Sequence, residues 1–382
     1  MKYRLTTLTP TLVGDGQKLS PIDYMVWKDQ VNVLDQTRIF RLLAKGPRLE
    51  NYLQQIKRAE KLDFASWGGF AQNFADRRIP FEHPSLSTYW EQARVESLHI
   101  PTFCAGPSGP FLPGSALKGV LRTAFLYTRW NAGVLREIGS RMEGDRPLRH
   151  PGDAAELMTI GSSGSDPLKA ISAGDSKPIP TSSFRVYLLR VSTLESRPQG
   201  KLELAWKQTN TRNSVPAGKA DQATPIFAEM AAPGAEFTGD FHETIFGKNP
   251  ELSRALRLGS SANPEAFFRA ANEYSSHLLK AQQQYAEWTG LSRLKQSLAD
   301  LQSRVAAAGS SSCVVNLGWG SGFLAKAGFL DTADEDYRKV LRSIPFFERS
   351  IRTGLPFPKT RRIVFLENQP ATLPGWALLE LQ

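Results

Sequence analysis

The sequence predicts an α+β protein of two domains, and three observations lead to this expectation. The chain has 382 residues, which is enough for two domains that each bury a core of their own. Residues 3–13 and 184–194 are rich in the side chains and the alternation that are typical of β-strands. Residues 264–288 instead repeat apolar side chains at steps of three and four, as an amphipathic helix does.

Composition and charge favour a folded protein with a polyanionic partner. Apolar residues make up 41% and charged residues 22% of the chain, as in soluble globular proteins. Lys and Arg number 47 against 37 Asp and Glu, so the formal net charge is +10 and the pI is near 9.6. A basic balance of this size favours nucleic acid over a membrane as the partner.

The cysteines and the N-terminus argue against several classes of protein. Cys104 and Cys313 form no Cys-x-x-Cys pair, so we expect neither a zinc site nor a disulfide framework. Residues 1–10 contain no continuous apolar run, and no stretch of the chain approaches the length of a membrane span. We therefore expect a cytoplasmic protein that contacts no membrane and needs no metal or other cofactor.

A glycine turn follows the first predicted strand. Gly14 and Gly16 flank Asp15, and Lys18 comes two residues later. The exposed amides of such a turn, with a lysine beside them, can bind a phosphate. A plain hairpin turn explains the same residues equally well.

The rest of the first half contains short strands, a helical segment and a long irregular one. A second strand is predicted at residues 31–35, and the pattern of residues 37–95 is mainly helical, so we expect a helical insertion there. Residues 139–180 lack apolar periodicity and are rich in Gly and Ser, which predicts a long loop. Further strands are predicted at residues 201–206 and 235–241.

A helix is predicted to begin after Pro113-Gly114, with Ser115 as its N-cap. The spacing i, i+3, i+4, i+7 gives it an apolar face formed by Leu117, Val120, Leu121 and Ala124. A different stripe of the same helix carries Ser115, Lys118, Arg122 and Arg129. Positive charge beside the free amides of a helix N-terminus suits a phosphate chain. An ordinary amphipathic helix with solvated basic residues has the same spacing.

A second helical insertion is predicted at about residues 245–307. Residues 264–288 and 291–305 continue one heptad pattern on either side of Thr289-Gly290, which predicts two antiparallel helices. Their apolar stripes are more typical of a core or a subunit contact than of a site for chemistry.

A glycine-rich loop is predicted at residues 316–326. Gly318, Gly320 and Gly322 stand at alternate positions, so the backbone can pass close to a ligand, and Lys326 follows. Phe323 occupies the place of the third glycine in a dinucleotide-binding fingerprint, and the chain has no P-loop motif for nucleotide hydrolysis.

A basic segment lies near the C-terminus. Lys359, Arg361 and Arg362 follow Phe357, and cations beside an aromatic side chain suit phosphate contact together with base stacking. The alternative is a solvated turn that leads into a strand at residues 363–366.

Several of these segments together resemble the RAMP proteins of type III CRISPR systems. The run Pro-Gly-Ser-Ala-Leu-Lys-Gly-Val-Leu-Arg-Thr from Pro113 resembles the RAMP signature. The segments Val-Gly-Asp-Gly from Val13, Leu-Ser-Pro-Ile-Asp-Tyr from Leu19 and Pro-Lys-Thr-Arg from Pro358 resemble one RAMP group, the fifth subunit of type III-A Csm complexes. Glu229 is part of a segment that resembles a Glu-x-x-x-Pro-Gly turn of the family, where we expect it to have a structural role.

The resemblance implies two ferredoxin-like (RRM-like) RAMP domains in tandem with helical insertions. The first domain would span residues 1–200 and the second residues 201–382. In RAMP proteins the glycine-rich loop packs beside the RNA-binding helix. The RNA contacts implied here are Gly14, Gly16, Lys18, Ser115, Lys118, Arg122, Gly318, Gly320, Gly322, Lys326, Lys359 and Arg361.

The function implied by the resemblance is that of a non-catalytic subunit that binds the CRISPR RNA (crRNA). It would hold the 3′ part of the crRNA, cap the filament of backbone subunits, and take part in crRNA maturation and antiviral defence. The implied partners are crRNA, target RNA, and backbone and small Csm subunits, with a host trimming nuclease as a further candidate.

The alternative is a metal-independent RAMP endoribonuclease that processes precursor crRNA, with Asp23 or His99 as the candidate group. The five histidines show no i, i+3 or i, i+4 pair, so metal-ligand spacing is absent. Capping of a turn is a sufficient reason for Asp23.

Overall fold

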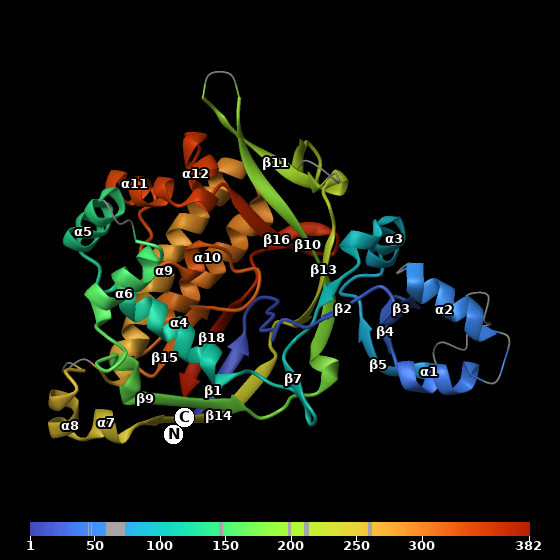
Figure 1. Cartoon of the computed structure of the whole chain (residues 1–382), viewed down its shortest axis with the longest axis horizontal. Coiled ribbons are helices and arrows are strands. Elements are labelled where there is room, and N and C mark those ends of the chain that lie inside the picture. The colour runs from blue at the N-terminus through green and yellow to red at the C-terminus, as the bar shows by residue number, and fades with distance from the viewer. Residues whose placement is uncertain are drawn as a thin grey trace.

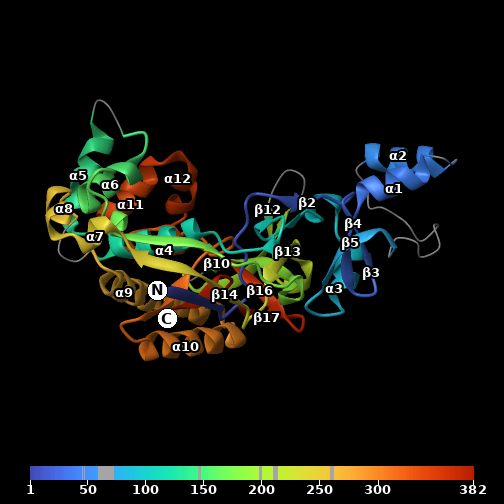
Figure 2. The same cartoon turned by 90° about the horizontal axis from the view of Figure 1, so that it is seen from below.

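The computed structural model describes residues 1–44, 46, 48–58, 73–144, 148–197, 200–209, 214–258 and 262–382. Antiparallel sheets with helices packed on them form the body of the molecule, which confirms the predicted α+β class (Figure 1). A smaller unit that contains α1 (Gln36–Leu43) and α2 (Arg48–Arg58) projects from one side of the body, as Figure 2 shows.

Two main sheets carry most of the strands. The first sheet has the order β15-β18-β1-β14-β9. Its strands are β1 (Lys2–Thr7), β9 (Ile171–Ser176), β14 (Glu236–Glu243), β15 (Ser312–Asn316) and β18 (Trp376–Leu381). The second sheet has the order β12-β11-β10-β16-β17, and β13 also pairs with β10. Its strands are β10 (Phe184–Ser196), β11 (Leu202–Thr209), β12 (Ser214–Ala217), β13 (Ile226–Ala231), β16 (Thr360–Leu366) and β17 (Gln369–Thr372).

The remaining elements are short strands and helices. The short strands are β2 (Lys18–Leu19), β3 (Tyr24–Trp27), β4 (Gln30–Leu34), β5 (Ala75–Pro80), β6 (Ile100–Pro101), β7 (Ala105–Gly106) and β8 (Gly109–Pro110). The other helices are α3 (Leu86–Gln92), α4 (Gly114–Tyr127), α5 (Ala132–Glu143), α6 (Pro151–Ile160), α7 (Ile245–Lys248), α8 (Pro250–Ala255), α9 (Pro264–Thr289), α10 (Ser292–Ala307), α11 (Glu335–Ser343) and α12 (Pro345–Arg352).

The first sheet joins the two ends of the chain. Leu5 on β1 pairs with Phe237 on one side and with Leu379 on the other. The main-chain N–H and C=O groups of Lys2 and Gln382 exchange hydrogen bonds of 3.1 and 2.8 Å, and the termini lie side by side in Figure 1. Both sheets therefore draw strands from both halves of the sequence.

The predicted boundary between residues 200 and 201 does not separate the two sheets. It falls inside the hairpin of β10 and β11, where Ser192 pairs with Trp206 and Ser196 with Leu202. Pairing between distant segments leaves no local pattern in the sequence, so periodicity could identify these strands but not their partners.

Local sequence explains the ends of the longest helix. The side chain of Asn263 accepts a hydrogen bond of 2.9 Å from the Ala266 N–H, which caps the start of α9. Gly290 ends the helix in the left-handed conformation, with φ +67°, and α10 begins two residues later. The structure thus forms two helices that meet at the predicted break.

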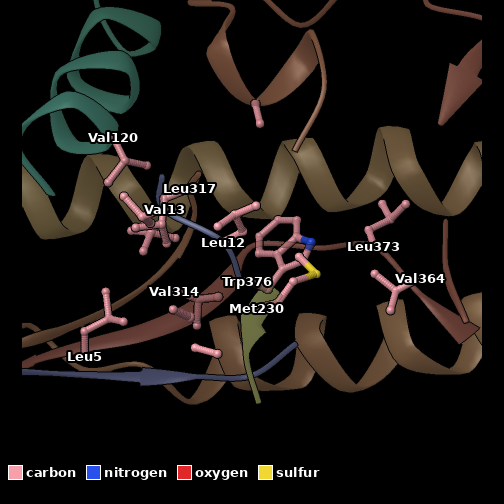
Figure 3. Close-up of a cluster of buried hydrophobic side chains, with 14 of the residues drawn as sticks. Leu5, Leu12, Val13, Val120, Met230, Val314, Leu317, Val364, Leu373 and Trp376 are labelled. Atoms are coloured by element: carbon pink, nitrogen blue, oxygen red, sulfur yellow. The ribbon is translucent and has the colours of Figure 1, made fainter. Parts of the chain in front are cut away.

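One hydrophobic core lies under both sheets and their helices. Leu5 of the first sheet, Val364 of the second and Met230 of β13 belong to the same cluster of buried side chains (Figure 3). The predicted apolar face of α4 is buried as expected in this cluster, through Leu117, Val120, Leu121 and Ala124. The continuous core explains why neither sheet stands alone as a separate unit.

Residues 139–180 are not the long loop that the sequence predicted. The segment contains the end of α5, the whole of α6 and the strand β9. Helix α6 buries only Ala155 and Ile160 and therefore lacks a clear apolar stripe. The sequence of β9 is Ile-Ser-Ala-Gly-Asp-Ser, and its pairing with β14, more than 60 residues away, defines it as a strand.

The described residues of the predicted helical insertion at 37–95 are part of a small α+β unit, and residues 45, 47 and 59–72 of that range lie outside the described residues. Helices α1 and α2 pack on the sheet β3-β4-β5, and Met25, Ile39 and Tyr52 belong to a separate hydrophobic cluster there. The prediction of helices was correct for α1, α2 and α3 but missed β5, whose sequence Ala-Asp-Arg-Arg-Ile-Pro has three charged residues in a row and little alternation.

A buried ion pair fastens this unit to the second sheet. Glu229 on β13 is 1% exposed, and its carboxylate lies 2.6 Å from the guanidinium of Arg77 on β5. Burial raises the pKa of Glu229, and the charge and hydrogen bonds of Arg77 oppose that effect. The structural role expected for Glu229 is therefore to form this ion pair with Arg77.

The main chain at Leu12 packs directly against residues 318–319. The Leu12 carbonyl accepts a hydrogen bond of 2.7 Å from the Trp319 N–H. Gly318 has φ +84°, and a Cβ added there would lie 2.2 Å from the same carbonyl oxygen. Only glycine fits this position without displacing the backbone.

None of the helices in the described part of the chain combines the length and the apolar character that crossing a bilayer would need.

We expect Arg77→Met to lower the free energy of unfolding by about 3 kcal/mol at pH 7, because it leaves the Glu229 carboxylate buried without a cation. A carboxyl pKa that is higher in the folded state means that stability is greatest at low pH and is lost as the pH rises through that pKa. The variant should therefore lose less stability near pH 5 than at pH 7, as urea unfolding at both pH values would measure.

Arg293→Met is the matched control for this variant. The partner of Arg293 is Glu367, and both side chains are exposed, so we expect a change below about 1 kcal/mol. An equal loss at both pH values in Arg77→Met would contradict the assignment to Glu229.

We expect Gly318→Ala to destabilise the fold by at least about 3 kcal/mol, because both the left-handed backbone and the Leu12 carbonyl oppose a side chain. Gly322→Ala is the control: its φ is +87°, but no atom lies within 4 Å of the added Cβ, so about 1 kcal/mol is expected. Thermal or urea unfolding measures both, and equal losses would show that the contact with Leu12 is unimportant.

Candidate nucleic-acid interface

The start of α4 is closed by a carboxylate of the protein itself. The Gly114 N–H donates to Asp175 Oδ1 at 2.9 Å. A Cβ at Gly114 would lie 2.2 Å from the Ala173 carbonyl oxygen, so glycine allows the helix to begin directly against β9. Asp175 therefore takes the place near the helix N-terminus that an anion would favour.

Ser115 is not the N-cap of this helix. Pro113 occupies the N-cap position and makes no side-chain hydrogen bond, so Ser115 is already helical. Its side chain is exposed. The prediction failed because Pro113-Gly114 can stand before a helix or begin one, and the contact with β9 selects the second arrangement.

The basic stripe of α4 is partly neutralised. The guanidinium of Arg122 pairs with Glu156 at 2.6 Å and also with Asp166. Lys118, one turn earlier, is half-buried, and no salt bridge of its side chain occurs within the described residues. Of these two predicted contacts, Arg122 is therefore paired with carboxylates, whereas the positive charge of Lys118 is not.

The N-terminal turn is exposed and fixed at both ends. Gly14, Gly16 and Lys18 are all exposed, and the Asp15 carboxylate accepts the Gln17 N–H at 3.0 Å. The turn lies next to the glycine loop, which we define as residues 316–326, because Leu12 contacts Gly318 and Trp319 as described above. Two predicted sites that are 300 residues apart in sequence are thus neighbours.

The glycine loop is held against β16 by an aromatic contact. The guanidinium carbon of Arg362 lies 5.0 Å from the ring centroid of Trp319. The loop, β10, β11 and β16 enclose a cavity of about 280 Å³, which we call the glycine-loop cavity. Its lining includes Lys207, Gln282, Gly320, Gly322, Arg361 and Arg362.

A second cavity joins the glycine loop to α4. It has a volume of about 250 Å³, and Arg122, Phe323 and Lys326 are among its lining residues. A Cβ at Gly328 would lie 1.7 Å from Leu126 of α4, so the chain after the loop packs tightly on that helix. The helix and the glycine loop therefore lie side by side.

Positively charged side chains outnumber acidic ones beside the glycine-loop cavity. Burial lowers the pKa of Lys207, and the positive charges of Lys359 and Arg362 lower it further. The acid among these neighbours is Glu195, which lies 3.3 Å from Lys359 Nζ. We call Lys207, Lys359 and Arg362 the cationic cluster.

Arg361 faces the protein interior. Its guanidinium donates to Gln282 Oε1 at 2.5 Å and to the carbonyl oxygens of Pro358 and Thr360 at 2.6 and 2.9 Å. It also lies over the ring of Tyr285, and burial lowers its pKa to about 10. Arg362, which belongs to the predicted basic segment but not to the predicted set of RNA contacts, lines the glycine-loop cavity together with Arg361.

Lys207 was also missed by the sequence analysis. It lies on β11 in the segment Leu-Ala-Trp-Lys-Gln-Thr, where one lysine in a strand carries no signal of its own. The pairing of β11 with β10 places it beside residues 359–362.

Of the residues considered for catalysis, Asp23 has a structural role. Asp23 accepts hydrogen bonds from the N–H and the hydroxyl of Ser20, at 2.7 and 2.6 Å, and so caps the turn before β3. No cluster of three or more His, Cys, Asp or Glu side chains suited to a metal occurs within the described residues. His99 lines a different cavity, which is analysed below.

Comparisons with known proteins agree with this arrangement. The family model of the RAMP superfamily matches residues 4–325. A Methanocaldococcus jannaschii protein described as CRISPR system Cms protein Csm5 is 22% identical over 148 residues. That alignment covers 35% of this chain and 32% of the relative, so it spans about a third of that protein.

Two solved structures share the fold. One is a chain of a Csm-crRNA-target RNA ternary complex of a type III-A CRISPR-Cas system, with a TM-score of 0.66, 22% identity and complete coverage of both chains. The other is T. onnurineus Csm5, with a TM-score of 0.62, 18% identity and coverage of 99% of this chain and 100% of that one. The resemblance to the fifth Csm subunit is thereby confirmed. Because the family model matches most of its length, the chain belongs to the RAMP superfamily.

Proposed function

We propose that this protein is a crRNA-binding subunit of a type III-A Csm complex, that it holds the 3′ part of the crRNA and that it caps the backbone filament. The observation that supports RNA binding best is the cationic cluster, in which three cations have one acid among them. A bound phosphate chain would relieve their mutual repulsion.

The exposed or half-exposed members of the predicted set are the proposed phosphate contacts. They are Gly14, Gly16, Lys18, Ser115, Lys118, Gly318, Gly320, Gly322, Lys326 and Lys359. The half-exposed Arg122 and the buried Arg361 are instead supporting residues, because their guanidinium groups already bind Glu156, Gln282 and neighbouring groups. Lys207 and Arg362 complete the surface. Backbone amides and cations bind phosphates without contacting the bases. Such binding is independent of sequence, which suits a crRNA whose sequence varies.

Exposed apolar side chains support contacts with other subunits. Phe346 on α12 is 84% exposed, and Ile245 on α7 is 63% exposed. Large apolar groups in such positions are typical of protein interfaces. Target RNA paired with the crRNA is a further proposed partner, since the complex that shares this fold contains both.

We expect Lys207→Ala with Lys359→Ala to weaken single-stranded RNA binding about tenfold, by similar factors for unrelated sequences. Removing two phosphate contacts should also reduce the slope of log affinity against log salt by about 1.4. Filter binding at several salt concentrations measures both quantities.

The control is Lys295→Ala with Lys339→Ala, which removes the same charge from ion pairs on α10 and α11. If the control weakens binding equally, net charge and not the cationic cluster holds the RNA. A loss restricted to some sequences would contradict a phosphate grip.

The proposed role needs no chemical step, so a repeat-containing precursor RNA incubated with the protein should stay intact with and without Mg²⁺. Specific cleavage that disappears in Asp23→Asn or His99→Ala would replace the proposed role with that of a processing endoribonuclease. Gel analysis of end-labelled RNA makes the distinction.

A further inference from the structure

A cavity of about 610 Å³ lies between the α3 segment and the second sheet, and we call it the α3 cavity. Its lining residues include Gln92, His99, Arg190, Lys207, Asp221 and Gln222. No residue of the RNA-contact set predicted from the sequence lines it. Its volume is in the range of cavities that bind small organic ligands, and one nucleotide fits within it.

The wall of the cavity contains a buried cation without a salt bridge. Arg190 is 2% exposed, and within the described residues its guanidinium forms no salt bridge and its Nε has no hydrogen-bond partner. The guanidinium carbon lies 4.7 Å from the ring centroid of Tyr89 and 4.9 Å from that of Phe365. Tyr89 also forms a side-chain hydrogen bond with Arg190, but neither aromatic ring replaces a carboxylate as a counter-ion.

Asp221, the carboxylate that acts on Arg190, does not neutralise the charge of its guanidinium. Asp221 lines the same cavity and acts on Arg190 through space, but it is exposed and makes no salt bridge with Arg190. A buried guanidinium in this condition gains most from a partner that brings both negative charge and several acceptor oxygens. Phosphate is such a partner.

The α3 cavity adjoins the glycine-loop cavity, which is part of the surface proposed to bind RNA. Lys207 and Val191 line both the α3 cavity and the glycine-loop cavity. Lys207, a member of the cationic cluster, and Arg190 therefore line one cavity together. Beyond Arg190, the amides of Gln92 and Gln222 offer donors and acceptors of the kind that the edge of a base requires.

We propose that the α3 cavity binds one nucleotide of the RNA strand, with a phosphate on Arg190 and Lys207 and the base toward Gln92 and Gln222. This inference rests on the proposed function for the source of the nucleotide. The recognised chemistry is that of a nucleoside phosphate, and a free nucleotide offers the same groups, so the experiment must separate the two sources.

The first test measures binding of AMP, adenosine and inorganic phosphate to the full-length protein by calorimetry. We expect AMP to bind at least about tenfold more tightly than adenosine, because the phosphate supplies the charge for Arg190. Arg190→Met should weaken AMP binding at least about tenfold. Equal affinities for AMP and adenosine, or unchanged AMP binding in Arg190→Met, would overturn the inference.

Arg185→Met is the matched control. Arg185 lies on the same strand, but its guanidinium donates to the carbonyl oxygens of Ser182 and Phe184 and does not line the cavity. We expect its AMP affinity to equal that of the unmodified protein. A loss as large as in Arg190→Met would mean that the effect spreads through the strand and does not come from the cavity.

Asp221→Asn keeps the inference testable if Arg190→Met fails to fold. Asp221 is exposed at the cavity, and removing its negative charge should tighten AMP binding by about two- to fivefold. Unchanged or weaker binding in this variant would count against a phosphate beside Arg190.

Competition between AMP and a labelled single-stranded RNA identifies the source. If the nucleotide belongs to the RNA strand, saturating RNA should abolish AMP binding. Simultaneous, independent binding of both would overturn the inference and leave a free-nucleotide site. Failure of the proposed function gives a different result. In that case the protein does not bind the labelled RNA, whether or not AMP binds to the α3 cavity.

Discussion

The contact between the Leu12 main chain and residues 318–319 is the constraint on which the proposed interface depends. The Trp319 N–H donates a hydrogen bond to the Leu12 carbonyl, and the glycine at position 318 allows the two backbone segments to lie in direct contact. That contact places the turn at Gly14 beside the glycine loop, and the packing of Gly328 on Leu126 places α4 on its other side. Three segments that are far apart in sequence become one surface.

The balance of charge differs from place to place on this surface. At α4 the protein supplies its own anions, since Asp175 closes the helix start and Glu156 pairs with Arg122. At the glycine-loop cavity burial lowers the pKa of Lys207, and the positive charges of Lys359 and Arg362 lower it further, whereas Glu195 opposes the shift. An anionic ligand gains more at the second place than at the first, because Lys207 and Arg362 form no salt bridge within the described residues, although Lys359 pairs with Glu195.

Aromatic rings have two roles around these cations. Trp319 holds Arg362 at the cavity wall, whereas Tyr285 lies over Arg361, whose hydrogen bonds are all made within the protein. Tyr89 and Phe365 place Arg190 in a third setting, buried but without a carboxylate. Three arginines of similar chemistry thus differ in what they can offer to a ligand, and tertiary contacts alone set that difference.

Sequence analysis was sufficient to predict the α+β class, the apolar face of α4, the helices α9 and α10 with their break at Gly290, and the segments that carry the RAMP resemblance. Each of these depends on residues within one or two turns of one another, where spacing and side-chain type are sufficient. The tertiary structure alone decided which strands pair, that β9 is a strand, and which basic residues face a cavity. Ser115, Arg122 and Arg361 have the right residue types for phosphate contact, but their surroundings are set by Pro113, Glu156 and Gln282. Glu156 and Gln282 approach from distant segments, and no local pattern records such an approach; at Ser115 the contact of Gly114 with β9 decides where the helix begins.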